Sequence, residues 1–486
     1  WVNNVVPHQM DLNRLFATMN TSGIQLEQAD ILKSKLLNKI ANDKHIFDGI
    51  WLACEHLDNY FERNVRKVFS DADWDNIQPE SLSEFSFDLF EKRDKDASKI
   101  KPKGLKIADL YQRLLDTEPP ANTEDESFDT YDDDKLKEET VYCRTIIQFP
   151  LLLIHAYRIY LARRCEPDIE PRLHSSRLLE IFESLIQSSP EDIEEFILTL
   201  WRVRYQFDTW VVKWVERDDS DKQELALTTT SGPTTDSPYI NRSKKELSAL
   251  VQLQSVRNFT GERSAQYWLS PFIGGLISIE EKRNGDNETL SLPKHTNNEV
   301  LPLLESIDNQ LSLVTGTQKN ASFEITKGQK PEVVKWQTQQ DYFSKPNGTG
   351  FEHYWFQKLE YLLWKNLKLS EFSFDKYELI KFKNYRVTSK NSVEHIHPQN
   401  NSQLPHDWLH HFGNLVLLSP GENSSYSDKP ESVKRAEFMK KESYDSLKSK
   451  HIFSLMGDGG DWTDLKIKDH HEDMLDVFTR HYGDHL

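Results

Sequence analysis

The chain has 486 residues, which is too long for one hydrophobic core and indicates about two to four domains. Its 12 Trp, 17 Tyr and 25 Phe residues supply enough core material to exclude wholesale disorder. No apolar run approaches the roughly 18 residues of a membrane-spanning helix, so we expect no membrane partner. The three cysteines, Cys54, Cys143 and Cys165, are far apart, which argues against a disulfide framework or a thiolate zinc site and favours a cytoplasmic location.

The net charge of −18 is unevenly distributed along the chain. Residues 351–486 hold 18 basic and 21 acidic residues, a net charge of −3, so the remaining −15 lies upstream. The same part of the chain holds 11 of the 17 histidines. A dedicated nucleic-acid binder is usually basic, so the total charge speaks against one. The distribution nevertheless directs the search for chemistry to the C-terminal third.

The N-terminal part is predicted to be helical. Because the chain starts with Trp1 rather than Met, we expect it to be a fragment. Apolar residues at helical spacing predict a helix near residues 12–19, a second after residue 25 and several more up to residue 117. The stretch 118–140 is predicted to be an acidic loop, because nine of the sixteen residues at 124–139 are carboxylates. A solvated loop and a DNA mimic that covers a basic groove are both open interpretations of it.

Helical patterns resume at residue 141. Residues 141–217 are predicted to form three helices, at 146–164, 175–187 and 190–216, and the last starts with Pro190 and two acidic residues. The polar, Thr-rich stretch 218–243 is predicted to be a linker. Residues 244–350 are predicted to be a helical and mixed connecting region, with helices at 244–258 and 265–279 and short strands after 281. In 351–486 we expect a helix at 351–369, strands at 385–388 and 392–396, and a final helix at 469–482.

The most informative stretch is Ser392-Val-Glu-His-Ile-His-Pro-Gln-Asn400, which His410-His-Phe-Gly-Asn-Leu-Val-Leu-Leu and then Asn423 follow. Hydrolysis of a phosphodiester with one metal ion needs a general base, and histidine suits neutral pH. It also needs a hard divalent cation, which prefers carboxylate and amide oxygens. Glu394, His395 and Asn423 supply that set of groups. A compact arrangement of strand, loop, strand and helix would bring them together.

This pattern resembles the HNH, or His-Me finger, nucleases, which have the ββα-metal fold. In that family an acid-His pair ends a strand and a proline follows three residues after the His. A middle Asn orders the loop, and another Asn or His lies on the next helix. Glu394-His395, Pro398, Asn414 and Asn423 match these positions. The whole string is more specifically similar to the C-terminal nuclease domain of GmrSD-type modification-dependent (type IV) restriction enzymes.

The stretch from Phe16 to Lys33 resembles part of the ParB-like domain of the same enzymes. Its Asn20-Thr-Ser-Gly23 turn is followed by Leu26 and Asp30 at matching places. The nucleotide motif usual in that domain, Asp-Gly-Gln-Gln-Arg, does not occur in this chain. A nucleoside triphosphate is therefore expected to bind only through a missing N-terminal part.

The resemblance implies a role for four residues. His395 is the general base, and Asn414 completes the catalytic group by ordering the loop around it. Glu394 and Asn423 hold one Mg²⁺ or Mn²⁺ ion.

The charge and histidine pattern adds candidate contacts to DNA phosphate. Each has a structural alternative. The alternative is packing for His397, a surface position for His411 and a solvated helix face for the basic cluster at 429–435. These candidates are His397, His411, Lys429, Lys434 and Arg435.

The sequence thus predicts a mainly α, multidomain protein. A remnant of a ParB-like α/β domain and following helices at 1–117 lead through a helical middle region to a C-terminal ββα-metal (HNH) nuclease domain at 351–486. The expected function is a metal-dependent DNA endonuclease of a bacterial anti-phage restriction system, which acts on or is licensed by modified phage DNA. Its partner is double-stranded DNA, and a homo-oligomer is left open. The alternative is a regulatory, DNA-binding or nucleotide-sensing subunit whose nuclease site is inactive or depends on a partner.

Overall fold

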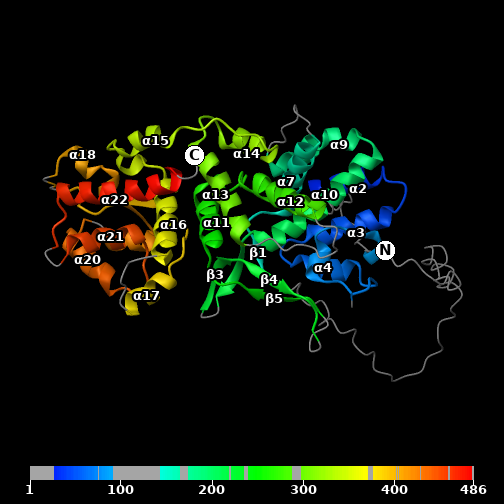
Figure 1. The fold of residues 1–486 in the computed structure, drawn as a ribbon, viewed down its shortest axis with the longest axis horizontal. Coiled ribbons are helices and arrows are strands. Elements are labelled where there is room, and N and C mark those ends of the chain that lie inside the picture. The colour runs from blue at the N-terminus through cyan, green and yellow to red at the C-terminus, as the bar shows by residue number, and fades with distance from the viewer. Residues whose placement is uncertain are drawn as a thin grey trace, which may run out of the picture.

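Most of the chain forms a series of helices in an elongated body, with the N-terminal helices at one end and the C-terminal helices at the other (Figure 1). This computed structural model describes residues 27–74, 76–90, 143–164, 173–217, 220–234, 239–286, 297–369, 376–400, 402, 404–426, 428–457 and 460–483. The predicted mainly α class is confirmed. Residues 1–26, which carry most of the predicted ParB-like remnant, and the predicted loop at 118–140 lie outside the described residues. None of the helices within the described ranges is long and apolar enough to cross a membrane.

The N-terminal helices pack around α10 (Pro190–Trp210). Ser189 caps this helix, because its hydroxyl accepts a hydrogen bond from the Asp192 N–H at 3.2 Å. The predicted start at Pro190 is confirmed, but the helix ends at Trp210 rather than at residue 216, since a strand begins three residues later. The other elements of this body are α2 (Gln28–Leu37), α3 (Lys44–Glu55), α4 (Phe61–Val68), η1 (Pro79–Leu82), α5 (Phe87–Phe90), α7 (Phe149–Arg163), η3 (Ser175–Arg177), α8 (Leu178–Ile181) and α9 (Glu183–Gln187).

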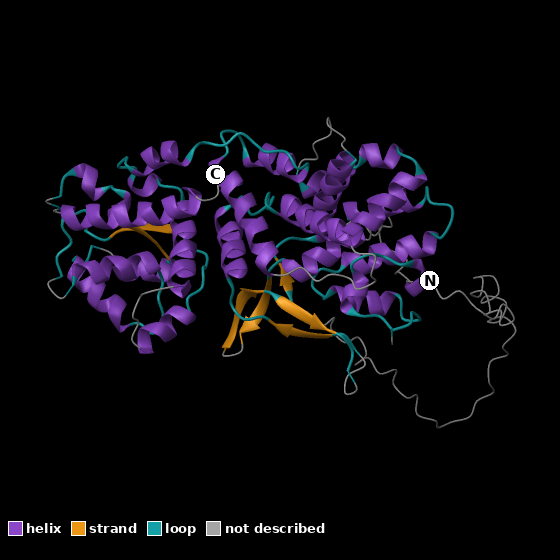
Figure 2. Ribbon diagram, in the orientation of Figure 1, coloured by secondary structure: helices purple, strands orange, loops and turns teal. Residues whose placement is uncertain are grey.

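The predicted linker at 218–243 is wrong, because this stretch contributes to two small antiparallel sheets (Figure 2). One sheet has the strand order β1-β2-β3 and the other pairs β4 with β5. The strands are β1 (Arg144–Thr145), β2 (Lys213–Arg217), β3 (Ser220–Ala226), β4 (Thr228–Ser231) and β5 (Asn241–Lys244).

Buried charge helps to attach the β4–β5 pair to the helices. Arg242 of β5 donates to Glu62 of α4 (2.9 Å), to Asp208 of α10 and to the Thr228 hydroxyl of β4 (2.7 Å). The Arg242, Glu62 and Asp208 side chains are all at least nine-tenths buried. A mostly polar stretch can therefore be an ordered part of the fold, which hydrophobic patterning does not reveal.

The middle of the molecule is mainly helical in its described residues. It contains α11 (Ala249–Thr260), α12 (Leu269–Asp286), α13 (Asn297–Leu313) and α14 (Gln318–Thr326). The short strands expected after residue 281 are replaced here by helices and one bridge between Val314 and Val333.

The C-terminal body surrounds one antiparallel pair of strands, β6 (Ser392–His395) and β7 (Leu415–Leu418) (Figure 2). It begins before the predicted boundary at residue 351, because Trp336 stacks on Tyr482 with ring centroids 4.8 Å apart and donates to the Thr479 hydroxyl at 3.0 Å. Its remaining elements are α15 (Trp336–Phe343), η4 (Gly348–Gly350), α16 (His353–Leu369), α17 (Lys376–Lys383), α18 (His406–Leu409), η5 (Phe412–Asn414), α19 (Pro420–Tyr426), α20 (Glu431–Lys440), α21 (Leu447–Met456) and α22 (Asp464–Gly483).

The strand predicted at 385–388 is not formed, although the backbone there is ordered. Gln252 of α11 donates to the Tyr385 carbonyl (3.1 Å) and accepts from the Val387 N–H (2.8 Å). Gln357 of α16 donates to the Thr388 carbonyl at 2.9 Å. Side-chain amides from two helices thus satisfy backbone groups that a neighbouring strand would otherwise pair with.

A buried cluster of charges joins the middle helices to the C-terminal body. Asp308 of α13 is fully buried and accepts from Arg257 of α11, from Lys358 of α16 (2.6 Å) and from the Tyr354 hydroxyl (2.9 Å). Burial alone would raise the pKa of Asp308, but the charges of Arg257 and Lys358 outweigh it and hold the pKa below its usual value. We call these four residues the Asp308 cluster.

We expect Asp308→Asn to lower the stability of the protein by about 3–5 kcal/mol, because it leaves two buried cations without their counter-charge. The folded pKa of Asp308 is lowered, so its stabilisation is complete at neutral pH and is lost as the pH falls through the carboxyl range. The melting temperatures of wild type and variant should therefore differ fully at pH 7 and converge only as the pH falls below 3.8, the ordinary pKa of the carboxyl group. The control is Asp476→Asn, whose side chain is 61% exposed and pairs with Arg480. If Asp308→Asn and Asp476→Asn lowered the melting temperature equally at neutral pH, the stabilising role of the Asp308 cluster would be contradicted.

Candidate active site

The acid-His pair lies at the end of β6, against a fully buried partner strand. Glu394 pairs with Val416 and His395 pairs with Leu415, so both backbones are fixed by the β7 ladder. All four residues of β7 are at most 2% exposed. The apolar run of β7 therefore provides the rigid support on which the polar end of β6 is placed.

Asn414 connects the two segments that flank this strand pair. Its side-chain oxygen accepts from the His397 N–H (2.9 Å) and from the Trp462 indole N–H (3.0 Å), and its amide nitrogen donates to the Leu409 carbonyl (2.8 Å). Its backbone carbonyl accepts from the Ile396 N–H at 2.9 Å. Asn414 is fully buried, and these contacts are those of a residue that orders the loop rather than one that touches a substrate.

His395 is 5% exposed and its ring lies between two polar side chains. Its Nε2 is 3.2 Å from Nδ1 of His410, and the Gln399 amide nitrogen is 2.8 Å from its Nδ1. Burial, with the nearby His410 and Lys434, lowers the pKa of His395 to about 4. The imidazole is therefore neutral at neutral pH, the form in which it can accept a proton.

The Glu394 carboxylate is held by a lysine. Lys434 of α20 donates from Nζ to Glu394 Oε1 at 3.0 Å and to the His395 carbonyl at 2.7 Å, and its side chain is fully buried. The predicted contact of Lys434 with DNA is therefore wrong. A basic residue in a charged run can lie on either face of its helix, and here the ammonium faces the candidate site. Burial raises the pKa of Glu394 despite this ion pair.

The other predicted DNA contacts lie in different surroundings. His411 is 8% exposed and packs edge-on against His471, with ring centroids 4.1 Å apart. Arg435 is partly buried and donates to the Phe453 carbonyl at 3.1 Å. His397 and Lys429 keep some exposure, and the latter pairs with Glu437 at 2.7 Å. Contact of these four residues with DNA stays a prediction.

The oxygen atoms suited to a hard cation lie on β6 and α19, which pack together. Within the described part of the chain, the side-chain oxygen of Asn423 is buried and has no hydrogen-bond partner. The Asp428 carboxylate accepts from the Asn400 amide at 2.7 Å, and its charge contributes to the raised pKa of Glu394. No three His, Cys, Asp or Glu side chains among the described residues could hold a metal together. A metal here would use Glu394, the Asn423 amide and water, a set typical of Mg²⁺.

Sequence reasoning missed the role of several neighbours. Gln399 follows His395 by four residues, but nothing in the spacing shows that its amide meets the imidazole. Gly348 precedes the motif by more than forty residues, and its N–H donates to the His410 carbonyl at 3.0 Å. The η4 turn that carries Gly348 packs beside β6, so the site depends on a segment outside the motif.

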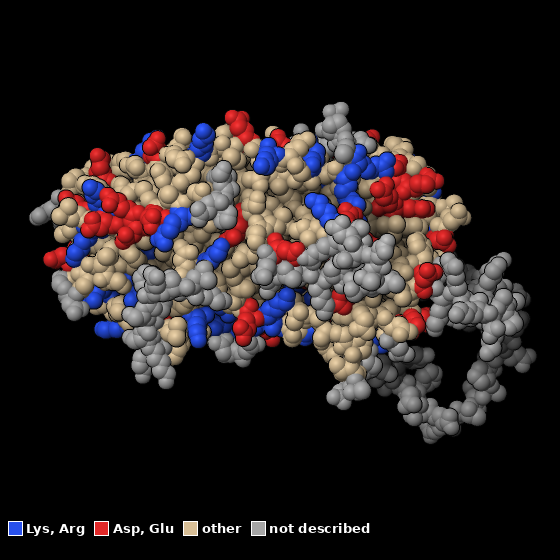
Figure 3. All heavy atoms as spheres, viewed as in Figure 1, with Lys and Arg blue, Asp and Glu red and all other residues tan. Residues whose placement is uncertain are grey.

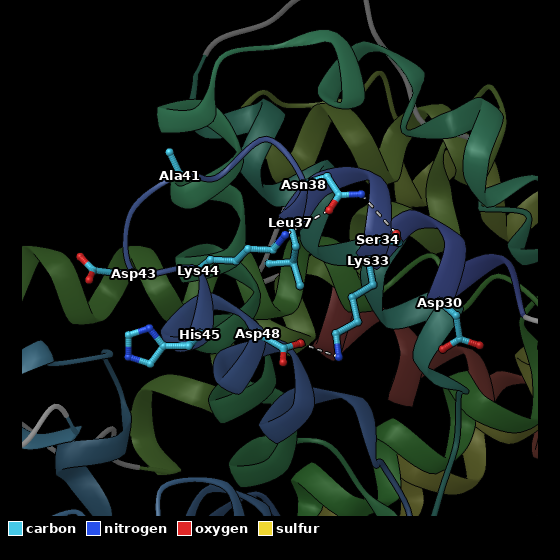
Figure 4. A pocket seen from close by; sticks show the side chains of 10 residues that line it. All are labelled: Asp30, Lys33, Ser34, Leu37, Asn38, Ala41, Asp43, Lys44, His45 and Asp48. Carbon is cyan, nitrogen blue, oxygen red and sulfur yellow. Dashed lines mark hydrogen bonds and ion pairs between the residues drawn. The ribbon is translucent and has the colours of Figure 1, made fainter. Parts of the chain in front are cut away.

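An open cavity of about 690 Å³ lies at the other end of the molecule, between α2 and α3 (Figure 4). Its rim carries charged side chains, among them Lys33, which pairs with Asp48 at 2.8 Å, and Lys44, which donates to Asn38 at 3.0 Å. The cavity shares no lining residue with the acid-His pair.

We expect Asn414→Ala to destabilise the protein by about 3 kcal/mol or more, because each buried group that loses its partner costs about 1–3 kcal/mol. The matched control is Asn423→Ala, which removes an amide oxygen that has no partner among the described residues. That variant should melt close to wild type. Thermal unfolding of both variants measures these stabilities. A larger loss of stability in Asn423→Ala than in Asn414→Ala would contradict the structural role of Asn414.

The comparisons with known proteins assign the part of the chain that holds this site. Residues 336–477 match the family model of the C-terminal domain of GmrSD restriction endonucleases. The match begins at Trp336, the first residue of α15, and includes every candidate site residue described above. No curated protein and no solved structure matches the chain. The C-terminal body is thus similar to a restriction endonuclease domain, whose substrate is DNA.

Proposed function

We propose that this protein is a metal-dependent DNA endonuclease of the HNH type, which serves a bacterial anti-phage restriction system. The observation that carries the proposal is the acid-His pair at the end of β6, which Asn414 fixes and which lies beside an amide oxygen of α19 that has no partner among the described residues. The match of this segment to a restriction endonuclease domain supports the same conclusion.

The side chains divide the reaction between them. The imidazole of His395, which is neutral at neutral pH, accepts a proton from the attacking water. Asn414 keeps the loop after β6 in the conformation that presents this ring. Glu394 and Asn423 would hold Mg²⁺ or Mn²⁺, which supplies positive charge for the scissile phosphate and the leaving oxygen.

The charge of the protein supports a requirement for a recognition signal such as modified DNA. The net charge is −18, and Figure 3 shows acidic side chains gathered over α22. The exposed acidic residues of this helix include Asp469, Glu472 and Asp473. Such a surface repels a DNA backbone over roughly one Debye length, about 10 Å at 0.1 M salt. Weak non-specific binding suits a defence nuclease that must spare host DNA.

A second candidate function is favoured by the Glu394–Lys434 ion pair. An ammonium at 3.0 Å from the carboxylate that would hold the metal weakens the attraction of that site for a cation. A regulatory or DNA-binding subunit with an inactive or partner-dependent nuclease site would have such an arrangement. Binding of DNA by the wild-type protein without any nicking, in either Mg²⁺ or Mn²⁺, would support this candidate.

We expect His395→Ala to lower the rate of plasmid nicking by about 10²- to 10⁴-fold, the usual contribution of a general base. The control is His397→Ala, whose ring lies 3.6 Å from a Glu431 oxygen and should affect the rate less. Nicking by folded His395→Ala at nearly the wild-type rate would disprove the assignment of the base.

Removal of divalent metal should abolish nicking, and Mg²⁺ or Mn²⁺ should restore it. Mn²⁺ can be titrated into each protein and its binding followed by electron paramagnetic resonance of the ion. Glu394→Gln and Asn423→Ala should bind Mn²⁺ more weakly than wild type does. Asp476→Asn, on the exposed face of α22, is the control for a general effect of charge. Undiminished nicking in excess EDTA would rule out the metal mechanism.

A further inference from the structure

The described site contains a second histidine that contacts the candidate base. Nδ1 of His410 lies 3.2 Å from Nε2 of His395, and the two rings meet edge-on at an interplanar angle of 86°. His410 comes from the segment after α18, fifteen residues further along the chain. A contact between ring nitrogens at this distance is a hydrogen bond in which one imidazole donates and the other accepts.

Backbone contacts hold His410 in this position from two sides. Its carbonyl accepts from the Gly348 N–H (3.0 Å), and its own N–H donates to the His406 carbonyl (3.1 Å). The Asn414 amide fixes the carbonyl of the preceding residue, Leu409, at 2.8 Å. Contacts from Asn414 and from the η4 turn therefore fix the backbone of His410 and of the residue before it.

Gly348 allows the close approach that this arrangement needs. Its φ of +54° lies in the left-handed region, and a Cβ at this position would be only 2.9 Å from Nδ1 of His410. Any side chain at position 348 would thus press on the nitrogen that meets His395. A glycine here preserves the contact between the two histidines.

The neighbours of His395 favour one position for the hydrogen of its neutral ring. The Gln399 amide nitrogen is a donor and lies nearer to Nδ1 (2.8 Å) than to Nε2 (3.1 Å). If Nδ1 accepts from this amide, the hydrogen of the neutral ring is on Nε2 and points to Nδ1 of His410. Burial and the nearby His406 lower the pKa of His410, so this ring is also neutral and its Nδ1 can accept.

We infer that His410 is a positioning residue that holds His395 in the Nε2–H tautomer and so reserves the Nδ1 lone pair for the attacking water. The inference rests on the proposed endonuclease function, because it assigns the orientation of that reaction's base. Attack then requires water to take the place of the Gln399 amide beside Nδ1. His410 itself touches no reacting atom and acts through the imidazole of His395.

The test measures the tautomer directly and cleavage separately. In the full chain labelled with ¹⁵N-histidine, the ring signals of His395 are identified by their loss in His395→Ala. Wild type should give the Nε2–H pattern, and His410→Ala should give a mixture of tautomers. We expect kcat for nicking to fall by about 10- to 100-fold in His410→Ala with KM unchanged, the size of effect typical of a partner that orients a functional histidine.

Three further variants distinguish positioning from a merely structural role. His410→Asn offers a carbonyl oxygen near the place of Nδ1 and should restore both the tautomer and most of kcat. Gly348→Ala keeps both imidazoles but displaces His410, so it should resemble His410→Ala. His45→Ala is the control, because this exposed histidine of α3 lies at the other end of the molecule from His410. It should leave the His395 signals unchanged.

The outcomes separate this inference from the proposed function. Unchanged His395 signals and an unchanged kcat in both His410→Ala and Gly348→Ala would overturn the inference, whether or not the protein is a nuclease. A changed tautomer in a protein that never nicks DNA would support the inference and defeat the endonuclease function. Thermal unfolding of each variant identifies any that fails to fold, in which case the other variant decides.

Discussion

The candidate site depends on the carboxamide of Asn414, because every polar atom of this side chain binds a different part of the C-terminal body. The segments beside it are fixed in turn by Lys448 of α21, whose ammonium donates to the Phe412 carbonyl (2.5 Å) and to the Leu415 carbonyl (2.6 Å). Glu360 of α16 accepts from the backbone N–H groups of Leu447 and Lys448 at the start of α21. A continuous set of hydrogen bonds thus leads from α16 to the end of β6. Since each group in it is buried, loss of one partner leaves another unsatisfied.

Buried charge acts together with apolar packing where other elements of this protein meet. The β4–β5 pair is attached through Arg242, and the middle helices meet the C-terminal body at the Asp308 cluster. Such pairs add little net stability compared with apolar contacts, but they tolerate few alternative partners. They therefore fix which elements meet, and this helps to explain how a polar chain reaches one arrangement.

Local patterns in the sequence predicted correctly the features that depend on neighbouring residues in the chain. The start of α10 at Pro190 follows from its cap, and the positions of Glu394, His395 and Asn414 around one strand pair follow from the motif. Errors arose where tertiary contacts decide. The linker at 218–243 is ordered by Arg242, and the strand at 385–388 lacks a partner strand because Gln252 and Gln357 bind its backbone. Burial of Lys434 and His411 depends on which face of a segment meets the site, and charge in the sequence does not record that.

The Asp308 cluster extends beyond the segment that matches the restriction endonuclease family. The segment similar to restriction endonucleases starts at Trp336, whereas Asp308 and Arg257, which surround Lys358 of α16, precede it. A domain excised at the family boundary would expose Lys358, which is buried in the whole chain, together with the Tyr354 ring that Arg257 covers. Recombination between relatives at that boundary would separate these charges in the same way. The segment that matches the family and the buried charge cluster attached to it therefore have different limits, and an excised C-terminal body that keeps this cluster would have to include α11 and α13.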